Sequence, residues 1–251
     1  MKHFMQERIE AYFDKLDNDA SLPEKYRRML LVTKAALADW EANNVNEQLA
    51  NRKAGSVIDT MFIDSGWSKY GVPKAAGAKI SDWCGMAVGH WHRKAGMPAA
   101  YNTSFLHVDN IAAFFSYYKV RGNNQKRYDS EVKINGFWED IEFAHVSRAD
   151  PRLFWLSKHI KVEDAPRRFI PGATLLFDWG SAVPYHTGVV AFYEEATSRV
   201  WTIEGNRTGL DVNGKKVRDA VALCSYAWND PNLYSVGHPA LMDFNPGLEV
   251  R

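Results

Sequence analysis

The hydrophobic periodicity of this chain changes at Pro171, and that change limits the possible folds more than any other feature. Before Pro171, apolar residues recur at helical spacing, as at Met5, Ile9 and Phe13. After it, short apolar or alternating runs are separated by turn residues. These runs predict strands over 174–179, 186–195, 199–205, 221–228 and 233–238. Helices followed by an antiparallel sheet predict an α+β fold.

The N-terminal half is expected to be helical over 5–16, 23–50 and 56–65. A further helix begins at Cys84 and ends at Gly96 and Pro98, a typical C-terminal pair. Two more helices are predicted over 103–118 and 150–159, the second opened by Asp150-Pro151. Asn213-Gly214 is typical of a hairpin turn.

Composition sets the class of protein. The 251 residues carry a formal net charge of +1, which gives no reason to expect a nucleic-acid or membrane partner. Two cysteines make no disulfide framework. No run of about 18 apolar residues is present. The N-terminus also lacks the apolar segment of a secretory signal. We therefore expect a single domain over 1–251, made in the cytoplasm without a signal peptide and not inserted in a membrane.

Cys84 stands at the predicted start of a helix, where the helix dipole favours a thiolate and the backbone N–H groups have no helical partner. A nucleophilic thiol also needs a base and a group that orients the base. His186 opens one predicted strand, while Glu204 and Asn206 close the next, antiparallel strand. Because strand side chains alternate, Glu204 and Asn206 are expected on one face, beside His186.

Four motifs carry these residues: W-C-G-x-x-V, P-G-x-x-L-L-F, H-T-G-V-V and I-E-G-N. Together they resemble the CHAP family of papain-like cysteine amidohydrolases and peptidases. The resemblance implies a papain-like fold, with the nucleophile helix packed on a C-terminal antiparallel sheet. It implies Cys84 as nucleophile, His186 as base, Glu204 as orienting group and Asn206 as a supporting polar group. The chain departs from the family at Ala173, where an Asp is usual.

The resemblance covers about residues 78–98 and 170–208. Residues 1–75 are then a helical extension and residues 119–168 an insertion. The implied reaction is hydrolysis of amide bonds in peptidoglycan peptides, as by a type VI secretion amidase effector or a phage lysin. Such a protein acts in the periplasm or cell wall of a target bacterium after export outside the Sec route. An immunity protein or a component of the secretion apparatus is an expected partner.

Two alternatives stay open at this point. One is a papain-like toxin that deamidates or cleaves a protein or a small amide inside a target cell. The other is a binding module without catalysis.

Side chains beside the motifs are candidates for substrate binding. Trp83, Trp179 and Tyr185 are predicted to line the cleft, although aromatic residues also pack in cores. Asp82 is predicted to cap the helix or to shape the oxyanion region.

No cofactor or metal is expected. His90 and His92 stand two positions apart on a helix and diverge, so they do not share a metal ion. Cys224, within an apolar strand, is expected in the core.

Overall fold

The computed structural model describes residues 4–22, 24–43, 45, 57–64, 83–96, 153–155, 162–180 and 185–237. Its helices are α1 (Phe4–Asp17), α2 (Glu24–Ala42), α3 (Val57–Asp64), α4 (Cys84–Lys94) and the short α8 (Ala165–Arg168), which follows a 3₁₀ turn at Val162–Asp164. The strands are β1 (Leu153–Trp155), β2 (Thr174–Phe177), β3 (His186–Glu194), β4 (Arg199–Leu210), β5 (Lys216–Ala227) and β6 (Leu233–Gly237).

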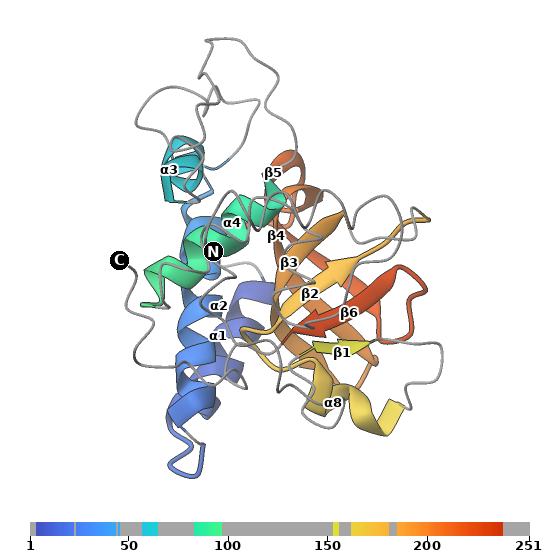
Figure 1. Cartoon of the computed structure of the whole chain (residues 1–251). Coiled ribbons are helices and arrows are strands. Elements are labelled where there is room, and N and C mark those ends of the chain that lie inside the picture. The colour runs from blue at the N-terminus through green and yellow to red at the C-terminus, as the bar shows by residue number, and fades with distance from the viewer. Residues whose placement is uncertain are drawn as a thin grey trace, which may run out of the picture.

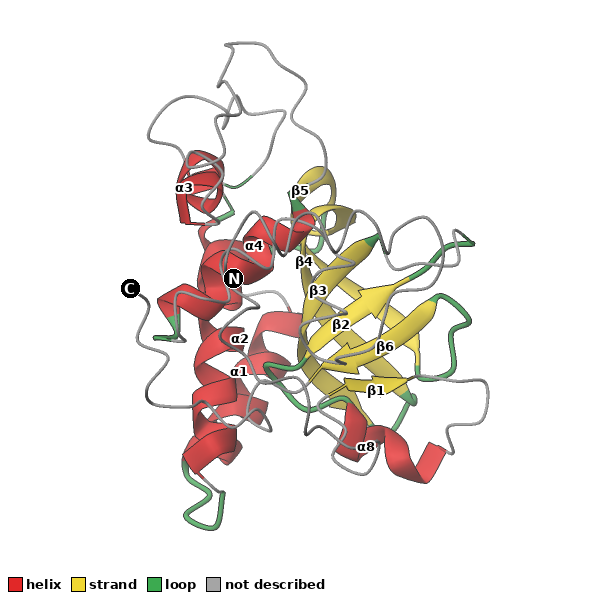
Figure 2. Cartoon of the chain, in the orientation of Figure 1, coloured by secondary structure: helices red, strands yellow, loops and turns green. Residues whose placement is uncertain are grey.

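The strands of the described residues form one twisted six-stranded sheet in the order β1-β6-β2-β3-β4-β5. Every neighbouring pair is antiparallel. Figure 1 shows α1, α2 and α4 on one side of this sheet, whereas α8 lies near its other side. The separation of helices from strands in Figure 2 makes the architecture α+β.

The core lies on both faces of the sheet. On one face, helix residues such as Ile9, Trp40 and Val88 pack with Leu176 and Ile203 of the strands. A second cluster gathers strand residues of the other face around Phe169, which follows α8. Alternation explains this division, because successive residues of a strand point to opposite faces.

The first helix belongs to this core. Met5, Ile9 and Phe13, spaced at one helix face, are each at most 5% exposed. Arg8 of α1 also makes an ion pair with Glu194 at the end of β3. Residues 4–17 therefore pack into the same core as the sheet.

Most predicted elements are present. The helices at 5–16 and 56–65, the helix that begins at Cys84, and all five predicted strands are confirmed, with β4 and β5 longer than predicted. The hairpin at Asn213-Gly214 is also confirmed, since it joins β4 to β5 with Gly214 at φ 73°. The second helix ends at Ala42 rather than near residue 50.

One prediction is wrong and two lie wholly or mostly outside the described residues. Residues 153–155, predicted as part of a helix, form strand β1 and pair with Ser235–Gly237 of β6. The long-range ladder outweighed the local helix-start signal of Asp150-Pro151, as tertiary context often does. The helix predicted over 103–118 and most of the predicted insertion are outside the described residues.

A helix that crosses a membrane must be both long and apolar. Within the described ranges, no helix meets both requirements.

Candidate active site

Cys84 is the first residue of α4, as the sequence predicts. The residue itself is only 1% exposed. Two contacts hold this end of the helix against β4. A Cβ atom at Gly205 would lie 2.5 Å from the Cβ of Ala87 and 2.8 Å from the ring of Trp83. Glycine at position 205 is therefore what allows the start of α4 to approach the strand so closely.

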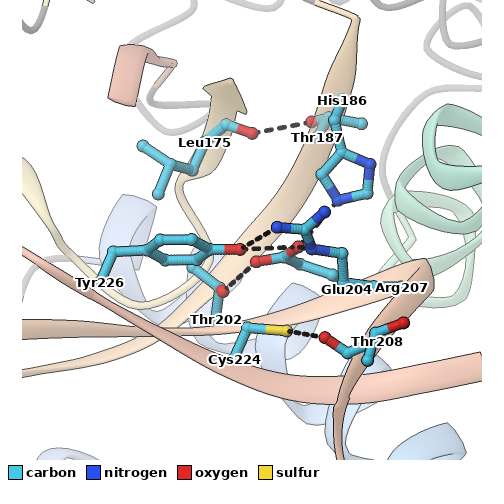
Figure 3. A network of polar contacts seen from close by, with 9 residues as sticks. All are labelled: Leu175, His186, Thr187, Thr202, Glu204, Arg207, Thr208, Cys224 and Tyr226. Carbon is cyan, nitrogen blue, oxygen red and sulfur yellow. Dashed lines mark hydrogen bonds and ion pairs between the residues drawn. The ribbon is translucent and has the colours of Figure 1, made fainter. Parts of the chain in front are cut away.

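His186 is the first residue of β3 and stands between Cys84 and Glu204. Its Nε2 lies 2.7 Å from Oε2 of Glu204. Its ring also lies close enough to the thiol of Cys84 for that thiol to raise the pKa of the imidazole. Because Nε2 is occupied by the carboxylate, Nδ1 is the nitrogen left for the sulfur. Figure 3 shows the ring above Glu204 with its second nitrogen turned away from that carboxylate.

Gly188 makes room for the contact between His186 and Glu204. A Cβ atom at Gly188 would lie 2.5 Å from Cγ of Glu204 and 3.0 Å from the carbonyl oxygen of Ile203. The Glu204 side chain thus occupies the space that a side chain at position 188 would take. The glycine of H-T-G-V-V is required here by close packing.

The Glu204 carboxylate is fully buried and is held by four groups. Besides His186, it accepts hydrogen bonds from Thr202 Oγ1 at 2.5 Å and from Tyr226 Oη at 3.2 Å. Nε of Arg207 lies 3.3 Å from its Oε2. Figure 3 shows these groups converging on one carboxylate from β4 and β5. A buried charge with this many partners is fixed in both position and ionisation.

Burial and charge act in opposite directions on these pKa values. Burial lowers the pKa of His186, but the charges and hydrogen bonds of Cys84 and Glu204 outweigh it and raise that pKa to about 9. Burial raises the pKa of Glu204, but His186, Thr202 and Arg207 bring it below its ordinary value. Burial and the Glu204 charge raise the pKa of Tyr226. The site therefore holds a protonated imidazole beside an ionised carboxylate at neutral pH.

A pocket of about 310 Å³ opens beside His186. It is lined by Trp179, Tyr185, His186, Asn206 and Arg207. The guanidinium carbon of Arg207 lies 4.4 Å from the centre of a Trp179 ring. The Trp179 and Tyr185 rings are tilted against each other with centroids 5.3 Å apart.

The structure brings three of the predicted catalytic residues into contact, namely Cys84, His186 and Glu204. Of Glu204 and Asn206, Glu204 is the one that bonds the imidazole. Asn206 lies on the wall of the pocket.

The predicted substrate-binding residues divide into three groups. Trp179 and Tyr185 line the pocket. Trp83 is instead fully buried beneath the start of α4, in the N-cap position, so it packs in the core and does not line the described pocket. Asp82 lies outside the described residues.

Arg207 and Tyr226 were not predicted. Strict alternation places Arg207 on the face opposite Glu204, but β4 bulges at this point. Glu204 pairs with Ala222 and Arg207 with Ala220, so β4 has one more residue than β5 between these pairs. Asn206 takes a positive φ of 55° within the bulge. Bulges reorient side chains, and this one turns Arg207 toward Glu204. Thr202 was also not predicted. Its position two residues before Glu204 indicates that the two side chains lie on the same face of the strand.

The second cysteine and the two helix histidines lie elsewhere. Cys224 is buried on β5 with its thiol 3.8 Å from the carbonyl oxygen of Thr208, and burial raises its pKa. His92 bonds Val88 and Thr174, and His90 lies near Asp39. Within the described ranges, no three His, Cys, Asp or Glu side chains are grouped so as to hold a metal ion.

Comparison of the chain with protein-family models, with curated proteins and with solved structures finds no match.

Proposed function

We propose that the protein is a papain-like cysteine hydrolase of the CHAP type that cleaves amide bonds in peptidoglycan peptides. The observation that carries the proposal is the position of the His186 ring, which lies beside the Cys84 thiol and bonds the buried Glu204 carboxylate. A nucleophile, a base and an orienting group in this order are what covalent amide hydrolysis needs. The substrate class comes from the resemblance of the four motifs.

The first half-reaction follows from the charges. Sγ of Cys84, as the thiolate paired with the His186 imidazolium, attacks the carbonyl carbon of the amide and forms a tetrahedral oxyanion. His186 then gives its proton to the nitrogen of the leaving amine as the C–N bond breaks. An acyl-enzyme remains on Cys84, and the imidazole is neutral.

The second half-reaction reverses the proton transfer. The neutral imidazole takes a proton from water while the water oxygen attacks the thioester carbon. The C–S bond then breaks, which restores the thiolate and the imidazolium and releases a carboxylic acid. Glu204 keeps the ring in one orientation and stabilises its positive charge throughout.

The oxyanion is stabilised by the start of α4. Cys84 is the first residue of that helix, where backbone N–H groups lack intrahelical acceptors. The N–H of Cys84 and the positive end of the helix dipole therefore favour a negative oxygen on the carbonyl that Sγ attacks.

The proposal is tested with purified protein and isolated sacculi. The wild type is expected to release new amines and defined muropeptide fragments, and mass spectrometry of these identifies the scissile bond. Cys84→Ala should remove this activity. Intact sacculi after long incubation with a correctly folded wild-type protein would contradict the proposed substrate.

Alkylation tests the reactivity of Cys84 independently of any peptide substrate. Iodoacetamide should add one label to Cys84, because a nucleophilic cysteine beside an imidazole reacts faster than a cysteine that only packs in the core. The adduct should persist in Cys224→Ala and disappear in Cys84→Ala. An inert Cys84 would favour a binding module without catalysis.

The site of action is tested by where the protein is toxic. Expression directed to the periplasm of a test bacterium should lyse the cells, whereas cytoplasmic expression should not. Toxicity confined to the cytoplasm would instead favour a protein or small amide as substrate.

A further inference from the structure

The pocket lies on the His186 side of the reacting pair. Its described lining includes His186 but not Cys84. In amide hydrolysis the acyl part of the substrate is bonded to the thiol, while the leaving amine receives its proton from the imidazole. On the proposed function, therefore, a pocket that extends from the imidazole receives the amine side of the substrate.

Arg207 gives this pocket its charge. Of the five described lining residues, it is the one that is permanently ionised. Its ion-pair partner Glu204 is fully buried behind it, so the carboxylate does not reach the pocket. The Arg207 side chain is 32% exposed. The described surface of the pocket is consequently cationic.

The guanidinium is held in place before any ligand arrives. It lies over a Trp179 ring at 4.4 Å, and its Nη2 lies 3.4 Å from Tyr226 Oη. A guanidinium has five N–H donors, and its contacts with Glu204, Tyr226 and Cys224 use at most three. A fixed cation with donors left over binds an anion at little cost in side-chain entropy.

We propose that this pocket selects amides whose leaving amine belongs to an amino acid with a free carboxylate, and that Arg207 binds that carboxylate. The planar guanidinium matches a carboxylate, with which it forms paired, charge-assisted hydrogen bonds. Tyr185, which is 45% exposed, and Trp179 provide an aromatic wall for the rest of the residue. The Asn206 amide lies on the same pocket wall.

The test uses two peptides that differ only in the amine-side residue, which ends in a carboxylate in one and a carboxamide in the other. The scissile bond is that identified from sacculi. The wild type is expected to prefer the carboxylate peptide by about 10- to 100-fold in kcat/KM. In Arg207→Met this preference should fall to about 1.

The ratio of the kcat/KM values for the two peptides isolates carboxylate binding from any effect of Arg207 on Glu204. If Arg207→Met also displaces Glu204, cleavage of both peptides slows by the same factor. That factor cancels in the ratio. Arg199→Met is the matched control, because it removes one cation from the same strand, where Arg199 bonds Ser225 away from the pocket. Its ratio should equal that of the wild type.

Two results would overturn the inference: a wild type that cleaves both peptides equally, and an Arg207→Met protein that keeps the wild-type ratio. A third measurement keeps it testable if no peptide is cleaved. Calorimetric titration of Cys84→Ala should then still show tighter binding of the carboxylate peptide, lost on adding Arg207→Met. Equal binding of the two peptides there would overturn the inference as well, whereas absence of cleavage alone contradicts only the proposed function.

Discussion

A buried histidine lies near each end of α4, and only one of the two is charged at neutral pH. At the N-terminal end Cys84 contacts His186 of β3, which is 7% exposed. Near the C-terminal end His92, which is 0% exposed, reaches across to Thr174 of β2. The pKa of His186 is raised to about 9, whereas that of His92 is lowered to about 4.

The partners explain the difference. The Nδ1 of His92 donates to the carbonyl oxygen of Val88 at 2.8 Å, and Nε2 lies 3.5 Å from Thr174 Oγ1. Burial lowers the pKa of His92, and the Val88 carbonyl offsets only part of this. His186 is buried too, but it faces a thiol and a carboxylate. Burial alone thus yields a neutral packing histidine, and buried anionic partners convert the same side chain into a cation available for acid–base chemistry.

Glu204→Gln is expected to have the largest effect on this comparison. The amide keeps a hydrogen bond to His186 but loses the charge that stabilises the imidazolium, so kcat/KM should fall by on the order of 100-fold. His186 is protonated below its pKa, so wild-type activity should decline as the pH rises through about 9. Removing the carboxylate lowers this pKa, and the alkaline limb of the pH–rate profile should move to lower pH. An unchanged alkaline limb would show that Glu204 does not set the charge of His186.

Gly188→Ala is expected to have the next largest effect, because the new Cβ atom would lie 2.5 Å from Cγ of Glu204. The carboxylate must shift away from His186, and we expect roughly a 10-fold loss of kcat/KM. The overpacking should also cost about 1–3 kcal/mol of unfolding free energy. Kinetics and urea unfolding measure the two separately. Wild-type activity in this variant would mean that the bond between His186 and Glu204 tolerates displacement.

Most element types and the placement of three of the four catalytic candidates were predictable, because they depend on local patterns. The start of α4 at Cys84 and the start of β3 at His186 coincide with changes of period that the sequence displays. Antiparallel pairing of β3 and β4 then brings Glu204 toward His186, as hairpin geometry requires.

The surroundings of Glu204 were not predictable in the same way. Arg207 reaches the carboxylate through a bulge that adds one residue to β4, and a period-two pattern carries no sign of it. Tyr226 arrives from β5, so its contact depends on the register of a second hairpin. Strand β1 was mistaken for a helix for a similar reason, since its pairing partner β6 lies about 80 residues away in sequence.

The smallest expected effect comes from His92 and concerns stability rather than activity. The folded-state pKa of His92 is about 4, below the ordinary value of 6.5 that applies in the unfolded chain. Between these values the unfolded chain binds more protons, so the folded state loses stability as the pH falls from about 6.5 toward 4, by about 1 kcal/mol per pH unit. His92→Asn can keep a donor toward the Val88 carbonyl but does not titrate, so its unfolding free energy should depend less steeply on pH across this window. Urea unfolding of the wild type and His92→Asn at several pH values measures the difference. Parallel curves of unfolding free energy against pH would mean that His92 takes up a proton without loss of its packing. That result would remove the contrast with His186.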